Sequence, residues 1–320
     1  MELSIVSTLY CSSRYISEFY IRISKVAQSL TQNYEIVFVN DASPDDSLAV
    51  ARKICEQDAR VKVLDLSRNF GHHRAMMCGV KHATGDRIFL IDVDLEELPE
   101  LLSDFWRTMN ADPEIDVVVG QLQEKKFPFL KRTTSSLFYR VFNALSAVRI
   151  SDREIVSRLM NRAYVDALME YQEREIFFPA IWVHAGFRQE KILATKTFDG
   201  NSTYTFKKRL IMAVEAITSF SSMPLIYIFY LGLLFSLGSA AFISVLLLKK
   251  LFIGHVILGW TSLMAALFLV GGIIIFSLGV VGIYVSKIYI EVKARPNSIV
   301  RKIYQREASK VTTGYISSKG

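Results

Sequence analysis

The chain has 320 residues, of which 51% are hydrophobic, and its formal net charge is +7. This length allows one large domain or two smaller ones. The three cysteines (Cys11, Cys55 and Cys78) show neither metal-ligand spacing nor a disulfide framework, which excludes a cysteine-rich scaffold and fits a reducing compartment. Apolar residues are unevenly distributed, because the chain is mixed in composition to about residue 210 and mostly apolar from 216 to 286.

Short apolar runs alternate with helical apolar spacing over the first 120 residues. The expected strands cover 3–9, 35–40, 61–66, 87–91 and 116–120, and the expected helices cover 15–30, about 45–57, 72–83 and 98–109. Such alternation predicts a mostly parallel sheet with helices on both faces. The chain contains neither G-x-G-x-x-G after its first strand nor a G-x-x-x-x-G-K-[ST] loop, so a classical dinucleotide fold or P-loop is not supported.

The expected strand at 87–91 ends in two carboxylates one residue apart, Asp92 and Asp94. Ligand sites in open α/β sheets lie beyond the carboxyl ends of the strands. A turn just after Asp92 would bring both carboxylates to one cation, and such oxygen ligands suit Mg²⁺ or Mn²⁺. The alternative is a solvated strand-to-helix turn, in which Glu96 and Glu97 favour the helix N-terminus.

The chain becomes irregular after Gly120. Residues 125–132 are basic with apolar residues between, and 129–145 have an amphipathic pattern. This pattern fits either a segment on an anionic membrane surface or an ordinary surface helix. We expect a further strand and turn at 179–189, and a helix that begins at Lys207 and ends near Ser219.

Two apolar segments follow, 223–248 and 251–286, and neither contains a Lys, Arg, Asp or Glu. Each exceeds the roughly 20 residues needed to cross a bilayer, so we expect two transmembrane helices. Only Lys249 and Lys250 separate them, whereas both outer flanks are rich in Lys and Arg. The positive-inside rule therefore places both termini in the cytoplasm and the turn outside.

Several short motifs occur in a characteristic order along the chain. They are VNDASPD (39–45), SRNFG (67–71), DVDLE (92–96), RLM (158–160), GF (186–187), ITSFS (217–221) and YIEVKARP (289–296). In this order, with the two apolar segments between the last two motifs, the chain resembles the inverting family 2 glycosyltransferases. It is most similar to the polyprenyl-phosphate glycosyltransferases, which include the dolichol-phosphate mannose synthases and the bactoprenol glucosyltransferases. The resemblance extends from the first strand to about Lys302.

The resemblance implies an α/β GT-A domain followed by a two-helix transmembrane hairpin, with a nucleoside diphosphate sugar as donor and Mg²⁺ or Mn²⁺ as cofactor. The implied divisions are a cytoplasmic GT-A domain (1–206), an amphipathic juxtamembrane helix (207–222), membrane helices at 223–248 and 251–286, and a basic cytoplasmic tail (287–320). The implied site residues are Asp92, Asp94 and Arg158 for catalysis, with Asp94 as the metal ligand; Asp41, Ser43, Arg68 and Asp92 for the nucleotide sugar; and Lys125, Lys131 and Arg132 for the acceptor phosphate. Guanidinium and ammonium groups suit such phosphate contacts.

The chain departs from the family pattern at three places. Relatives usually have Tyr-Asn-Glu after the first strand, where this chain has Tyr10 followed by Cys11 and Ser12. They commonly have Gly-Asp-Phe before Arg-Leu-Met, whereas Ile155, Val156 and Ser157 stand here, so a carboxylate often given a catalytic role is a valine. The basic residues of a later R-x-x-x-G-x-S-[KR]-[YF] pattern are replaced here by Thr197 and Thr203.

The expected function is transfer of a hexose from an NDP-sugar, a UDP-sugar in the first place, to polyprenyl phosphate at the cytoplasmic leaflet of the inner membrane. One alternative keeps the donor but uses a hydroxyl of a lipid-linked saccharide as acceptor. Another is a non-catalytic membrane scaffold, against which the intact Asp92 and Asp94 argue. Because relatives form oligomers, we also expect a homo-oligomer, and we expect no nucleic-acid partner.

Overall fold

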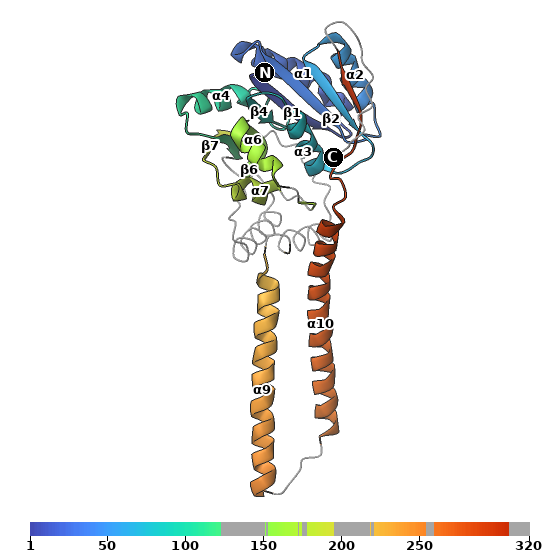
Figure 1. The fold of residues 1–320 in the computed structure, drawn as a ribbon, viewed down its shortest axis with the longest axis vertical. Coiled ribbons are helices and arrows are strands. Elements are labelled where there is room, and N and C mark those ends of the chain that lie inside the picture. Colours follow the sequence, from blue (N-terminus) through green and yellow to red (C-terminus); the bar gives the residue numbers. More distant parts are fainter. Residues whose placement is uncertain are drawn as a thin grey trace. The chain divides into compact units, whose positions relative to one another are not determined.

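The computed structural model describes residues 1–122, 151, 153–171, 173–174, 178–194, 218, 221–253 and 259–306, and the chain divides into two compact units. The first comprises Met1–Tyr139, Arg149–Thr203 and Arg295–Gly320, and the second comprises Arg140–Val148 and Tyr204–Ala294. Figure 1 shows the strands and helices of the two units.

The first unit is built on one mixed sheet with the strand order β7-β5-β6-β4-β1-β2-β3-β8. Its strands are β1 (Leu3–Leu9), β2 (Tyr34–Asn40), β3 (Val61–Leu66), β4 (Arg87–Leu90), β5 (Val117–Leu122), β6 (Glu154–Asn161), β7 (Gln189–Ala194) and β8 (Val300–Gln305). The central strands β4, β1, β2 and β3 are parallel to one another, whereas β6 and β8 run antiparallel to their neighbours. The predicted mostly parallel α/β sheet is therefore confirmed.

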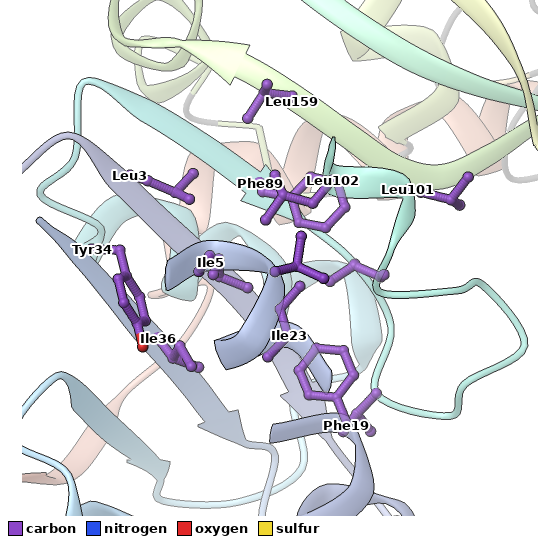
Figure 2. Close-up of a cluster of buried hydrophobic side chains, with 14 of the residues drawn as sticks. Leu3, Ile5, Phe19, Ile23, Tyr34, Ile36, Phe89, Leu101, Leu102 and Leu159 are labelled. Atoms are coloured by element: carbon purple, nitrogen blue, oxygen red, sulfur yellow. The ribbon is translucent and has the colours of Figure 1, made fainter. Parts of the chain in front are cut away.

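Helices cover both faces of this sheet (Figure 1). They are α1 (Ser13–Leu30), α2 (Ser47–Gln57), α3 (His72–His82), α4 (Leu101–Ala111), α6 (Arg162–Met169) and α7 (Phe178–His184). Figure 2 shows the core under α1 and α4, where Phe19 and Ile23 of α1 pack with Ile5, Ile36 and Phe89 from the strands. Burial of such side chains contributes about 1.5–3 kcal/mol each, which holds these helices on the sheet.

Helix α3 packs on the opposite face at unusually close range. A Cβ atom at Gly79 would lie 2.4 Å from Val6 Cγ1 and 2.8 Å from Val39 Cγ2. Only glycine allows this approach without a shift of the helix. The close packing places the N-terminus of α3 beside the carboxyl ends of the central strands.

The structure corrects the expectation of a strand at 179–189. Residues 178–184 form helix α7, and β7 begins only at Gln189. Phe178, Ile181 and Trp182 are buried, which is the i, i+3, i+4 spacing of one helix face. In a segment this short, that spacing was obscured by β-favouring aromatic and branched residues. The amphipathic segment 129–145 and the expected helix at 207–219 lie outside the described residues, apart from Thr218.

The second unit contains two long helices, α9 (Met223–Ile253) and α10 (Trp260–Lys293). The Tyr284 hydroxyl of α10 donates a 2.6 Å hydrogen bond to Ser221 O, just before α9 begins. Helix α9 continues through Lys249 and Lys250, so the two lysines do not form the connection between the helices. Lysine is a good helix former, which explains why a charged pair does not end the helix.

Within the described residues, the segment Leu269–Lys293 of α10 is long and apolar enough to cross a membrane, and none of its most apolar 18-residue window is buried. In α9 the apolar stretch identified in this way is shorter, Met223–Phe235. Large side chains such as Leu234 and Ile275 are exposed. One candidate span is present in the described part, and the second span remains a prediction.

Candidate functional site

The carboxyl ends of β1, β2 and β4 meet at one edge of the sheet, because these neighbouring strands are parallel. The backbone after each of them has a left-handed residue: Cys11 (φ 52°), Ala42 (φ 48°) and Leu95 (φ 61°). This conformation costs about 1–2 kcal/mol for a residue with a side chain. Such strained positions concentrate at functional sites, so this edge is the candidate site.

Asp41 follows β2 and is almost fully buried, with 2% of its surface exposed. Its Oδ1 accepts a hydrogen bond from Phe70 N (2.7 Å), and its Oδ2 accepts one from Gly71 N (2.9 Å). Gly71 has φ 94°, a conformation that favours glycine. Asp41 therefore fixes the loop that follows β3, the SRNFG segment.

Asp45 connects two further loops of the site. Its Oδ2 accepts from Ser13 N (3.0 Å), and its Oδ1 accepts from Ser47 N (3.0 Å) and from the hydroxyls of Ser43 and Ser47 (2.5 Å each). Ser43 Oγ in turn accepts from Cys11 N at 2.8 Å. Partial burial raises the pKa of Asp45, but these hydrogen bonds outweigh it and hold the pKa far below its ordinary value. Asp45 thus fastens the β1–α1 loop to the β2–α2 loop.

The two carboxylates after β4 are partly exposed. Asp92 Oδ1 lies 3.4 Å from His72 Nε2, and His72 Nδ1 lies 3.1 Å from Thr8 Oγ1. Desolvation, followed by the neighbouring His73, lowers the pKa of His72 to about 4. His72 therefore connects Thr8, at the end of β1, with Asp92, at the end of β4.

Asp94 closes the turn after Asp92, because its Oδ1 accepts from Glu96 N at 3.0 Å. The left-handed conformation of Leu95 completes this turn. No group of three or more His, Cys, Asp or Glu side chains is arranged to hold a metal within the described ranges. Two carboxylates suffice for an ion that takes its other ligands from water and substrate phosphates.

Glu97 lies directly beneath this turn with 1% of its surface exposed. Its carboxylate accepts hydrogen bonds from Val156 N (3.3 Å), Ser157 N (2.9 Å) and the Ser157 hydroxyl. Glu97 therefore joins the acidic turn to the beginning of β6. This geometry makes it a positioning residue for Val156 and Ser157.

Arg158 follows on β6 and is fully buried. Its guanidinium donates to Val156 O (3.2 Å) and Ile155 O (3.3 Å) and lies 3.0 Å from the centre of the Trp182 ring. Burial lowers the pKa of Arg158 to about 10, so it still has its charge at neutral pH. Its Nη1 atom makes no hydrogen bond within the described part of the chain. Arg158 thus places a positive charge inside the unit rather than at its surface.

The other predicted site residues divide into two groups. Ser43 belongs to the Asp45 network, and Arg68 is exposed with its guanidinium 4.3 Å from the centre of the Phe70 ring. Lys125, Lys131 and Arg132 lie outside the described residues, so their role remains a prediction. The sequence analysis missed His72, because a histidine at the beginning of a helix has no signal in one sequence until its strand neighbours are known.

Residues 11–169 match the family described as glycosyl transferase family 2, a range that includes Asp41, Asp92, Asp94 and Arg158. A protein of Mycobacterium tuberculosis named "Putative glycosyltransferases" is 40% identical over 98% of this chain and 93% of its own length. The chain belongs to glycosyl transferase family 2.

Other members of this family match the chain over almost its whole length. The bactoprenol glucosyl transferase of Shigella phage SfII is 30% identical over 95% of this chain and 99% of its own. Among solved structures, the mannosyltransferase PcManGT from Pyrobaculum calidifontis, in complex with GDP-Man and Mn²⁺, is 15% identical with a TM-score of 0.45 and covers 92% of this chain and 86% of that one. The family membership confirms that the chain is a glycosyltransferase with a GT-A domain.

Proposed function

We propose that this family 2 glycosyltransferase transfers a hexose from a UDP-sugar to polyprenyl phosphate, with inversion at the anomeric carbon. The observation that supports this best is the match to bactoprenol glucosyl transferases over 95–100% of the compared lengths, which extends beyond the sheet to both long apolar helices. A lipid-phosphate acceptor also explains why a soluble-type catalytic unit is followed by an apolar helix that fits a membrane.

In this proposal the edge formed by β1, β2 and β4 binds the donor. The Asp41 and Asp45 networks hold the three loops around the nucleotide, and Asp92 lies at the ribose and diphosphate. Asp92 and Asp94 fit a magnesium or manganese ion, because they supply two hard, partly exposed oxygen donors one residue apart, and such an ion takes its remaining ligands from water and the diphosphate. A bound ion would offset the charge that develops on the leaving diphosphate.

The choice of acceptor rests on Val156. A hydroxyl acceptor needs a general base, because its proton must leave during the attack. A phosphate monoester with a second pKa near 6 is mostly dianionic at neutral pH and needs no such base. Glu97, whose carboxylate is hydrogen-bonded to this segment, already accepts from Val156 N, Ser157 N and the Ser157 hydroxyl. The segment therefore favours a phosphate acceptor, for which Lys125, Lys131 and Arg132 are the proposed cationic contacts.

The proposal includes an inner-membrane protein with two transmembrane helices, whose catalytic unit and termini are cytoplasmic. It is supported by the apolar length of α10 and by the lysines and arginines after it. A reporter fused after Gly320 should read cytoplasmic, and a tag inserted between α9 and α10 should be labelled from outside. A periplasmic carboxyl terminus would contradict the proposed topology.

The decisive experiment is a screen of UDP- and GDP-sugars with undecaprenyl phosphate, the full-length protein in detergent, and Mn²⁺ or Mg²⁺. We expect one donor to yield a lipid product with one phosphate that is labile to mild acid, as a glycosyl phosphodiester is. The Asp94→Asn variant is the inactive control. If the protein instead extends a lipid-linked saccharide through an acid-stable bond, the acceptor is a hydroxyl; if no donor is consumed or bound, the catalytic proposal is wrong.

A further inference from the structure

Strand β8 comes from the far end of the chain and completes the sheet beside the candidate donor loops. Helix α10 ends at Lys293, and β8 (Val300–Gln305) then pairs antiparallel with β3. Just before β8, Ile299 O accepts a 2.9 Å hydrogen bond from Ser67 N, the first residue of the SRNFG loop. The same loop is held at its other end by Asp41. The segment that follows the last apolar helix therefore contacts a loop of the donor edge directly.

A buried charge lies at this junction. Asp65, in β3, has 0% exposure, and its Oδ2 accepts from Arg301 Nε (3.0 Å) and Nη2 (2.5 Å). A buried carboxylate is strongly destabilising unless it is paired. Arg301 lies in β8 with 61% of its side chain exposed, so its guanidinium compensates Asp65 while its other side faces solvent.

The other oxygen of Asp65 leads back to the site. Asp65 Oδ1 accepts from Asn40 Nδ2 at 2.9 Å, and Asn40 is the cross-strand partner of Asp65 at the end of β2. This bond orients the amide so that Asn40 Oδ1 faces Ser43 N at 3.4 Å. Ser43 then accepts from Cys11 N and donates to Asp45. A continuous path of polar contacts runs from Arg301 to the loops after β1 and β2.

We infer that Arg301 is a positioning residue for donor binding, which acts through Asp65 and Asn40 on the loops that surround the nucleotide. The inference rests on the proposed function and adds to it a residue 236 positions away from Asp65 in the sequence. Loss of the guanidinium leaves Asp65 buried with one partner, and protonation of Asp65 or rotation of Asn40 then releases the Ser43 contacts. We expect the loss to change nucleotide affinity and not kcat, because none of these residues is one of the proposed metal-binding carboxylates, Asp92 and Asp94.

The test compares Arg301→Gln, near the beginning of β8, with a matched control just after the other end of the strand, Arg306→Gln. Arg306 is also exposed and donates hydrogen bonds, but to Glu56 O and Gln57 O at the end of α2, away from the donor loops. The full-length protein in detergent is titrated with UDP and with GDP in the presence of Mn²⁺. We expect Arg301→Gln to weaken nucleotide binding about tenfold and to raise KM for the donor with little change in kcat. Arg301→Lys should recover most of the affinity, and Arg306→Gln should bind as the unchanged protein does.

A second measurement does not depend on the nature of the donor. Hydrogen exchange of the ligand-free protein should be faster in Arg301→Gln than in Arg306→Gln at peptides covering residues 40–46 and 66–71. Equal exchange in the two variants, or equal loss of affinity in both, would overturn the inference and indicate a purely structural strand. If the unchanged protein binds neither UDP nor GDP, the proposed function is wrong. Faster exchange at the two loops in Arg301→Gln would then still show that Arg301 positions them.

Discussion

The ends of β2 and β4 both bear aspartates at the same edge of the sheet, yet the two regions use them differently. After β2, Asp41 is 2% exposed and each of its oxygens accepts a backbone N–H. After β4, 20% of the Asp92 side chain is exposed, and the imidazole of His72 lies 3.4 Å from its Oδ1. A carboxylate saturated by backbone donors fixes the chain, whereas a partly exposed pair can bind a cation. The same residue type therefore has a positioning role in one region and, in the proposed function, a ligand-binding role in the other.

The sharpest test of this difference is Asp94→Asn. A neutral amide is a poor ligand for a hard cation, so we expect activity to fall on the order of 10³-fold while the fold is kept. Excess EDTA should have the same effect on the unchanged protein. The control is Asp86→Asn, an exposed aspartate before the opposite end of β4. Full turnover in EDTA would show that Asp92 and Asp94 do not bind a catalytic metal ion.

Asp41→Asn should have a smaller and different effect. The amide keeps one acceptor but turns an N–H donor toward Phe70 N or Gly71 N, so the SRNFG loop loses one of its two anchors. We expect nucleotide affinity to fall about tenfold, with a smaller change in kcat. Asp46→Asn, an exposed residue in the same loop whose side chain does not cap α2, is the matched control. A loss of kcat as large as that of Asp94→Asn would erase the distinction between the two regions.

Glu97→Gln extends the comparison beneath the β4 turn. The buried carboxylate accepts two backbone N–H groups and the Ser157 hydroxyl, so its replacement should lower the free energy of unfolding by about 1–3 kcal/mol. The pH dependence of kcat should not change, because Glu97 positions β6 and does not act as a base. Thermal unfolding and a pH–rate profile, with the half-buried Glu96→Gln as comparison, separate the two effects. If one limb of the pH–rate profile disappeared in Glu97→Gln but not in Glu96→Gln, Glu97 would be a catalytic base.

The smallest effect is expected at Asp45 and depends on pH. Its folded-state pKa lies below the value near 3.9 of the unfolded chain, so its stabilising contribution is fully present above about pH 4 and is lost as the pH falls further. Asp45→Asn should therefore unfold more easily at pH 7, by about 1 kcal/mol, and the difference should shrink below pH 4. Thermal midpoints of the two proteins across this range provide the measurement. If the difference in thermal midpoint grew as the pH fell, the pKa of Asp45 would not be lowered in the folded protein.

Much of the fold could be predicted from the sequence because its signals are local. Apolar runs with a period of two or 3.6 placed the strands and helices of the first 120 residues, and the abrupt end of the 87–91 run placed the acidic turn. The misassigned segment at 179–189 shows the limit of such signals, since a seven-residue helix offers too few turns for its period to be distinguished from a strand.

The roles within the site were decided by contacts between distant residues. The sequence alone determined that Asp41, Asp92, Asp94 and Glu97 lie near strand ends, because an aspartate or glutamate after an apolar run needs no partner to be noticed. Only the tertiary structure decided which of them is saturated, since the donors to Asp41 lie about 30 residues away and the partner of Glu97 lies 60 residues away. For Asp65 the separation from Arg301 is 236 residues. Hydrogen bonds of this kind depend on the register of strands that the chain brings together from its two ends, and no local pattern specifies that register.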